Sequence, residues 1–307
     1  MAAGWLWVVF TITAAFFQTL RNAMQRELTR HLGTVGATHV RFLFGFPFAM
    51  IFLLGLLVGT DVALPRPGLA FWPWVIDGAG AQVAATALML VAMGERSFVV
   101  TIAYLKTEPI QVAVFGLIFL GDRVSAPMTV AILVATAGVI VMSTPLPTLP
   151  RKRGREGWGI GGLKPTLIGL ASGGMFALSA VGYRGAILDL HLPNFVMAAT
   201  FTLVIGLVMQ AVLLSFYLLL RSPTVLSAIA RDWKPSLFAG FMGALASQFW
   251  FLAFALATAA SVRTLALVEV LFAQLVARFA FRQKTSLREA VGMVLVVAGV
   301  ALLVFEY

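Results

Sequence analysis

The chain has 307 residues, of which 61% are hydrophobic and 11% are charged, whereas about a quarter of the residues in a soluble protein are charged. It contains no cysteine, which excludes disulfide frameworks, thiolate metal sites and cysteine nucleophiles. Its formal net charge of +10 comes from basic residues that are spread between apolar segments, so we expect an integral membrane protein rather than a nucleic-acid-binding one.

Apolar windows of about 20 residues, the length that crosses a bilayer as a helix, follow one another along the whole chain. They lack the strict alternation of barrel strands, and backbone groups in lipid must be hydrogen-bonded within their own segment, so the windows predict helices. The ten windows are residues 4–20, 35–58, 71–93, 97–119, 125–143, 164–185, 193–220, 233–257, 259–281 and 286–305. The predicted fold class is an all-α integral membrane protein with ten transmembrane helices.

Basic residues concentrate in alternate connections between the windows. The connections after odd-numbered windows carry fifteen lysines and arginines, Arg21, Arg26 and Arg30 among them, and the opposite set carries only Arg66 and Arg123. Because basic segments resist translocation, we expect the odd connections in the cytoplasm and both termini on the extracytoplasmic side.

The second half of the chain repeats features of the first half at an offset of 161 residues, which places Glu108 on Glu269 and the AGV triplet 137–139 on the triplet 298–300. Five windows in each half is an odd number, so the halves enter the membrane in opposite directions, as is typical of secondary transporters. The predicted domains are a first five-helix repeat at 1–145, a cytoplasmic linker rich in Pro, Gly and Arg at 146–163, and a second, inverted five-helix repeat at 164–307.

Several segments carry a family resemblance. They are Arg41 within THVRFLFGFPFAM, the fourth-window segment LKTEPIQVAVFGLIFLGDRVS and the small-residue pattern ATAGVIVM, which the second half repeats as LVEVLFAQLVARFAFRQKTS and VVAGVALLV. On these segments the chain resembles the drug/metabolite transporter superfamily, and specifically its ten-span EamA-type members. It departs from that pattern at Val270, where a second proline is usual, and at Gln283, which stands opposite Asp122.

This resemblance implies a secondary active transporter of the cytoplasmic (inner) membrane, and not an enzyme. It implies alternating access for a small organic metabolite such as an amino acid, an amine or a drug-like solute, with export coupled to protons or to exchange. Expected partners are that solute, membrane lipids and protons, without nucleic acid, cofactor or metal. Family members are described with both termini in the cytoplasm, whereas the distribution of basic residues in this chain predicts termini on the extracytoplasmic side. The alternatives are a lipid or lipid-linked sugar flippase of the same fold and, less favoured, an integral membrane enzyme.

Two glutamates lie near the middle of apolar windows, where a carboxylate costs about 2.5–3.5 kcal/mol. Glu108 precedes Pro109, which lacks an amide hydrogen and so predicts a local break of the helix at the bilayer centre. Glu269 has apolar neighbours on its own helix face, which favour the neutral form that a proton carrier needs. We predict that both glutamates couple transport; a structural ion pair with Arg263 or Lys106 is the alternative for Glu269.

Further polar and aromatic side chains complete a predicted cavity walled by the first, third and fourth helices and their repeat counterparts. Lys106 lies about 200° around the helix from Glu108, so its partner is expected on another helix, at Glu269 or Asp77. Arg41 is expected to snorkel to the cytoplasmic surface. For the amides and aromatic rings, interhelical hydrogen bonding and packing are the alternatives. The predicted substrate-binding residues are Gln18, Asn22, Gln82, Tyr104, Lys106, Glu108, Gln111, Gln248, Trp250 and Glu269.

Overall fold

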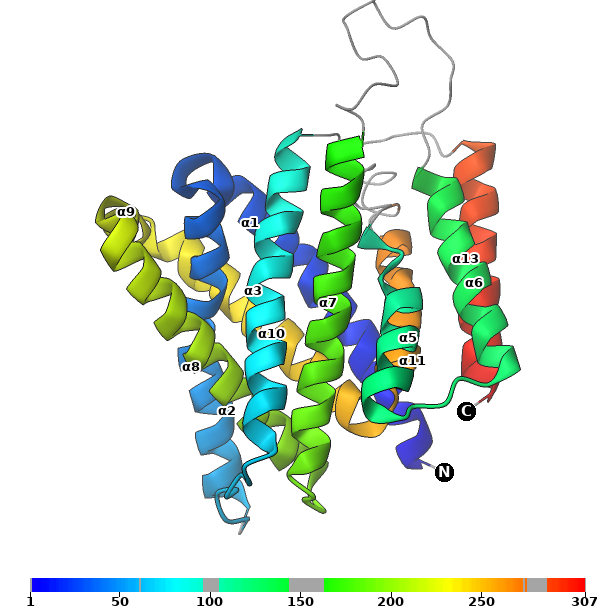
Figure 1. Cartoon of the computed structure of the whole chain (residues 1–307), viewed down its shortest axis with the longest axis horizontal. Coiled ribbons are helices and arrows are strands. Elements are labelled where there is room, and N and C mark those ends of the chain that lie inside the picture. Colours follow the sequence, from blue (N-terminus) through cyan, green and yellow to red (C-terminus); the bar gives the residue numbers. More distant parts are fainter. Residues whose placement is uncertain are drawn as a thin grey trace, which may run out of the picture.

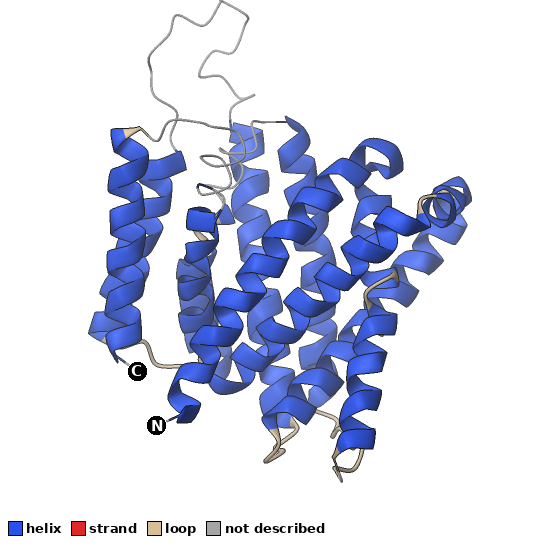
Figure 2. Ribbon diagram, turned by 180° about the vertical axis from the view of Figure 1, so that it is seen from behind, coloured by secondary structure: helices blue, strands red, loops and turns tan. Residues whose placement is uncertain are grey.

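The computed structural model describes residues 2–60, 62–95, 105–143, 163–272, 274 and 286–306, and this part of the chain consists of helices and short connections without strands (Figures 1 and 2). The longer helices are α1 (Leu6–Leu43), α2 (Phe46–Gly59), α3 (Phe71–Glu95), α5 (Glu108–Leu120), α6 (Ala126–Ser143), α7 (Leu163–Asp189), α8 (Phe195–Arg221), α9 (Pro223–Arg231), α10 (Trp233–Leu256) and α13 (Leu287–Glu306). The short elements are η1 (Ala2–Trp5), α11 (Ala259–Leu265) and η3 (Ala266–Val268).

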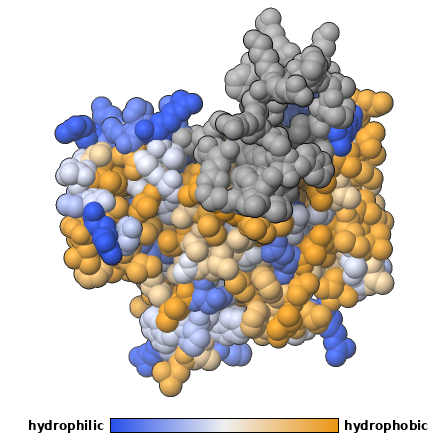
Figure 3. Space-filling model, turned by 45° about the horizontal axis from the view of Figure 1, so that its top comes forward, coloured by the Kyte–Doolittle hydropathy of each residue, from blue (hydrophilic) through white to orange (hydrophobic). Residues whose placement is uncertain are grey.

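Length and composition make this a multi-pass membrane protein. Five described helical segments are long and apolar enough to cross a membrane: Glu27–Gly59, Phe71–Ala92, Phe195–Arg221, Trp233–Leu256 and Leu287–Glu306. Large apolar side chains such as Phe216 and Val294 are exposed on the outer flanks of the helices. Figure 3 shows apolar residues over much of the face in view, with hydrophilic residues at its edges and in smaller patches between them. Such exposed apolar area is favourable against lipid and costly against water.

The first helix differs from its predicted window. It continues to Leu32 and turns at Gly33, whose φ of 67° glycine adopts without strain. Arg21 therefore lies inside the helix, and its expected place in a cytoplasmic connection is wrong: it is 2% exposed. The window ended early because hydropathy averages over all faces of a helix, whereas Arg21, Asn22 and Gln25 share the face that meets the interior of the bundle.

Three long helix pairs organise the bundle: α1 packs along α10, α3 along α7, and α6 along α13. The pair α6 and α13 approaches closely at the two AGV triplets. A methyl group on Gly138 would lie 2.7 Å from the carbonyl oxygen of Gly292, and one on Gly299 would lie 2.6 Å from the amide nitrogen of Ala135. Small residues at such a crossing let two helix backbones pack in direct contact.

Two helices in the centre of the bundle are interrupted. Leu105 is helical, Lys106 and Thr107 form a turn, and α5 starts at Glu108, with Pro109 in its first turn. The predicted break beside Pro109 is therefore confirmed. Helix α11 has only 7 residues and continues as the 3-10 helix η3 up to Val268. The helices α5 and α11 contact each other, so both interruptions lie inside the molecule (Figure 1).

Candidate functional site

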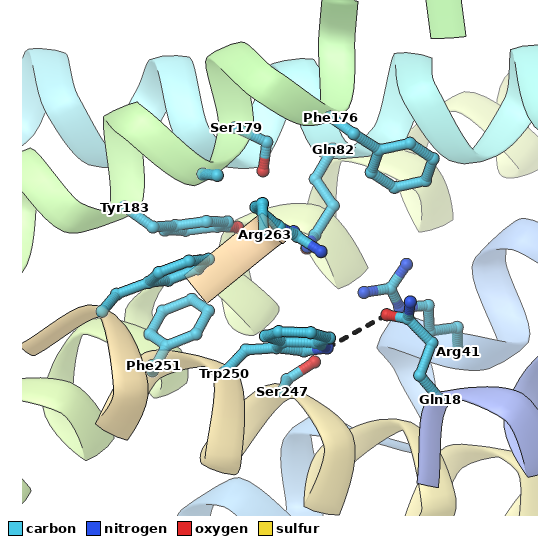
Figure 4. Close-up of a pocket in the computed structure, with 12 residues that line it drawn as sticks. Gln18, Arg41, Gln82, Phe176, Ser179, Tyr183, Ser247, Trp250, Phe251 and Arg263 are labelled. Carbon is cyan, nitrogen blue, oxygen red and sulfur yellow. Dashed lines mark hydrogen bonds between the residues drawn. The ribbon is translucent and has the colours of Figure 1, made fainter. Parts of the chain in front are cut away.

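Polar side chains from both halves of the chain line two adjoining cavities inside the bundle. The first, which we name the carboxylate cavity, has a volume of about 40 Å³, space for about three water molecules. It is lined by Gln18, Arg21, Asn22, Met89, Leu105, Lys106, Glu108, Phe176, Arg263 and Glu269. The second, the aromatic cavity of about 10 Å³, is lined by Gln18, Arg41, Gln82, Phe176, Ser179, Ala180, Tyr183, Ser247, Trp250, Phe251, Phe254 and Arg263 (Figure 4).

Two ion pairs cross between the halves of the chain in the carboxylate cavity. Lys106 Nζ lies 2.7 Å from Glu269 Oε2, and Arg263 Nε lies 3.1 Å from Glu108 Oε1. Each cation thus pairs with the glutamate of the other half, and all four side chains are at most 14% exposed. The Arg263 N–H does not point along a hydrogen bond to Glu108, so this contact is an ion pair without an aligned hydrogen bond. Removing one partner of a buried pair leaves the other charge uncompensated.

The environment of Glu269 is more polar than its own helix neighbours predicted. Besides Lys106, the amide groups of Gln18 and Asn22 donate to its two carboxylate oxygens, at 3.3 and 3.5 Å. These amides are four residues apart and share one face of α1, as the sequence predicted. The expected apolar surroundings of Glu269 are therefore wrong, because the first helix supplies polar groups that its own helix lacks.

The aromatic cavity is built around Trp250. Its indole nitrogen donates to Gln18 Oε1 at 3.0 Å, and the guanidinium carbon of Arg263 lies 4.6 Å from the centre of its ring (Figure 4). A guanidinium over a desolvated indole face contributes about 2 kcal/mol or more. Trp250 thus holds Arg263 and Gln18 in place, and both of these residues line the two cavities.

Two buried arginines belong to the site although the sequence reasoning assigned them elsewhere. Arg41 is 3% exposed, donates from Nη1 to Thr86 Oγ1 at 3.1 Å and lines the aromatic cavity, so the expected snorkelling to the surface is wrong. Arg21 lines the carboxylate cavity and donates from Nη2 to Asn22 Oδ1 at 2.7 Å. The signal for Arg21 was present: Gln18, Arg21, Asn22 and Gln25 follow the i, i+3, i+4, i+7 pattern of one helix face.

The remaining predicted site residues lie in different places. Gln82 lines the aromatic cavity and accepts from Gln210 Nε2 at 2.9 Å. Gln111 donates to Thr107 Oγ1 and Gln248 donates to Thr200 Oγ1, and neither lines the two cavities. The structure thus leaves both outside the site. Tyr104 lies outside the described residues.

Other ionisable groups find partners away from the cavities. Arg184 pairs with Asp122 at 3.2 Å and donates to the carbonyl oxygens of Phe254 and Ala257, which ties α7 to the connection after α5 and to the C-terminal end of α10. Among the described residues no group of three His, Asp or Glu side chains is arranged to hold a metal ion. The two cavities are lined by charged, amide, hydroxyl and aromatic side chains.

Comparisons with known proteins bear on the fold alone. No protein-family model matches the sequence, and no curated protein matches it either. A solved protein crystal structure superposes with a TM-score of 0.71 and 16% sequence identity, over 98% of this chain and 95% of that one. At this identity the likeness shows that the whole chain has the architecture of a known fold.

Proposed function

We propose that this protein is a secondary active transporter that moves a small organic metabolite across a membrane by alternating access. One observation carries the proposal: two ion pairs cross between the halves of the chain inside a polar cavity, next to the interruptions of α5 and α11. Desolvating each ion costs several kcal/mol, and apolar residues of similar volume would stabilise the bundle as well or better. Buried charges in membrane helices mark solute or ion pathways.

The proposal includes ten spans arranged as two inverted five-helix repeats. Helix α1 belongs to the first window and α10 to the eighth, while α3 belongs to the third window and α7 to the sixth. A shift of five windows replaces α1 by α7 and α10 by α3, so the pair α1 and α10 corresponds to the pair α7 and α3. The same shift replaces α6 by α13, so the third pair corresponds to itself. Such an exchange is what two halves related by a two-fold axis would produce, and inverted repeats of this kind rock against each other around a central site.

In this conformation the crossed ion pairs hold the halves together around a small cavity. Space for about three waters cannot hold an organic solute, so loading requires the wall helices to separate. Separation breaks contacts between α5 and α11, and with them the pairs Lys106–Glu269 and Arg263–Glu108. A solute or a proton that binds the released glutamates binds the open conformation more tightly than the closed one. This difference in affinity shifts the equilibrium between the two conformations. We assign Glu108 and Glu269 this coupling role.

The test is the variant Glu269→Gln, reconstituted in proteoliposomes and assayed for exchange of labelled amino acids, organic acids and amines. We expect the exchange seen with the unmodified protein to be lost. The neutral amide of glutamine can neither form the ion pair with Lys106 nor take up and release a proton. The matched control is Glu27→Gln, since Glu27 is 62% exposed and pairs with Arg30 on the surface of α1. Full exchange with unchanged pH dependence in Glu269→Gln would remove the coupling role.

A further inference from the structure

We propose that the transported solute carries an anionic group, a carboxylate or a phosphate, and that Arg21 and Arg41 bind this group inside the two cavities. The inference rests on the proposed transport function and narrows its solute class: it favours organic acids over amines that carry only positive charge. It follows from unused hydrogen-bond donors, from the position of the two arginines and from the charge of the cavity walls.

The first observation is that both arginines are buried with donors left over. Arg21 is 2% and Arg41 3% exposed. The Nε and Nη1 groups of Arg21 and the Nε group of Arg41 have no hydrogen-bond partner in the described part of the chain. Their only described hydrogen bonds go to neutral oxygens, of Asn22 and Thr86. Neither guanidinium forms an ion pair with a described residue, although Glu269 lies across the carboxylate cavity from Arg21. Buried donors without partners are costly, so an anion between the two groups would satisfy them.

The second observation is that the two side chains lie together on α10. A methyl group on Gly243 would lie 3.3 Å from Cδ of Arg21 and 3.5 Å from Cγ of Arg41. Both side chains therefore cross the same point of α10, and each lines one of the adjoining cavities. Figure 4 shows the Arg41 guanidinium pointing into the aromatic cavity next to Gln18. Two like charges held side by side repel each other, and a shared anion removes that repulsion.

The third observation is the charge of the walls. The residues that line the two cavities include four cations, Arg21, Arg41, Lys106 and Arg263, and two carboxylates, Glu108 and Glu269, a formal excess of two positive charges. Both carboxylates already pair with Lys106 and Arg263. The excess thus belongs to Arg21 and Arg41. Guanidinium groups bind carboxylate and phosphate oxygens in a bidentate manner, and the aromatic cavity offers rings for an apolar remainder of the solute.

The experiment measures binding to the full-length protein, purified in detergent, by isothermal titration calorimetry. The probes are phenylacetate, phenyl phosphate, the neutral phenylacetamide and the cationic phenethylamine. We expect at least one of the two anions to bind at least tenfold more tightly than phenylacetamide, and phenethylamine to bind most weakly. The stronger of the two anions identifies carboxylate or phosphate as the group recognised. Equal affinity for both anions and phenylacetamide would overturn the inference.

Variants assign the binding to the two arginines. Arg21→Gln and Arg41→Gln are each expected to weaken anion binding at least tenfold and to leave phenylacetamide binding unchanged. Arg30→Gln is the control, because Arg30 lies on the same helix, is 69% exposed and pairs with Glu27. Anion binding that survives in the double variant Arg21→Gln, Arg41→Gln would overturn the assignment.

Thermal unfolding without a ligand separates a binding role from a structural one. If the arginines serve an anion, replacing either by glutamine removes an uncompensated buried charge, so Tm is expected to stay the same or to rise. A lowered Tm in both glutamine variants, together with anion binding that both variants retain, would indicate structural residues and contradict the proposal.

The same probes keep this inference apart from the proposed function. If anion binding depends on Arg21 and Arg41 but no flux occurs in proteoliposomes, the anion site is supported and the proposed transport function is wrong. If a neutral or cationic solute is transported and neither glutamine variant changes its flux, the transport function is supported and the anion site is wrong.

Discussion

Glu108 and Glu269 depend on cations that the opposite half of the chain supplies. Because all four side chains are buried, the value of each pair lies in the penalty of an unpaired partner rather than in the attraction itself. The sequence predicted both glutamates, since charged residues within apolar windows are conspicuous, and it left Glu269 and Asp77 as alternative partners of Lys106, of which the structure shows Glu269. It did not predict Arg21 and Arg41, because window averages contain no information on which helix face meets the interior.

The Arg263–Glu108 pair is expected to behave as a coupled unit in unfolding experiments. Arg263→Gln alone should lower the free energy of unfolding by about 3–5 kcal/mol, because Glu108 stays buried without its cation. The double variant Arg263→Gln, Glu108→Gln should lose less free energy of unfolding than the single variant Arg263→Gln. The exposed pair Arg30–Glu27 is the control, with an expected coupling of about 0.5 kcal/mol. Additive losses at Arg263 and Glu108 in denaturant titrations would contradict the pairing.

At the level of the element, the site is formed where helices stop. Helix α5 begins at Glu108, so the carboxylate lies in a first turn, where the helix dipole favours negative charge. Pro109 made this break predictable, because it lacks the amide that a continuous helix requires. The 3-10 segment η3 before Glu269 has no such marker, and its geometry follows from packing against α1, α6 and α13.

Restoring the missing amide tests the role of the break. Pro109→Ala lets the helix continue through Lys106 and Thr107, which changes the direction in which Lys106 and Glu108 project. We expect equal or higher thermal stability and at least a tenfold lower exchange rate. Pro223→Ala is the control, since Pro223 starts the short helix α9, away from the cavities. An exchange rate equal to that of the unmodified protein would show that the break has no part in transport.

At the scale of the whole molecule, both termini lie at one end of the helices, and the C-terminal end of α6 and the N-terminal end of α7 lie at the other (Figure 1). This arrangement fits an odd number of crossings in each half, which the proposed repeats require. Composition and hydropathy predicted the all-helical membrane class and most helix positions. They missed α9, because nine amphipathic residues are too short and too polar for a hydropathy window.

We still expect the orientation that the basic residues of the odd connections predict, although Arg21, Arg26 and Arg30 lie within α1. A reporter enzyme that is active only outside the cytoplasm, fused after Tyr307, is expected to be active. The same reporter inserted in the predicted linker, residues 146–163, should be inactive. The opposite result for both fusions would invert the topology.

The central claim is that the two halves expose one internal cavity to each side of the membrane in turn. The chain contains no cysteine, so a single Ser247→Cys variant, in the wall of the aromatic cavity, can be labelled without background. We predict that a membrane-impermeant maleimide modifies this cysteine from either side, in right-side-out and in inverted vesicles. Val212→Cys, which is 63% exposed on the flank of α8, should resist the reagent from both sides. Modification of Ser247→Cys from one side only, or from neither, would contradict alternating access.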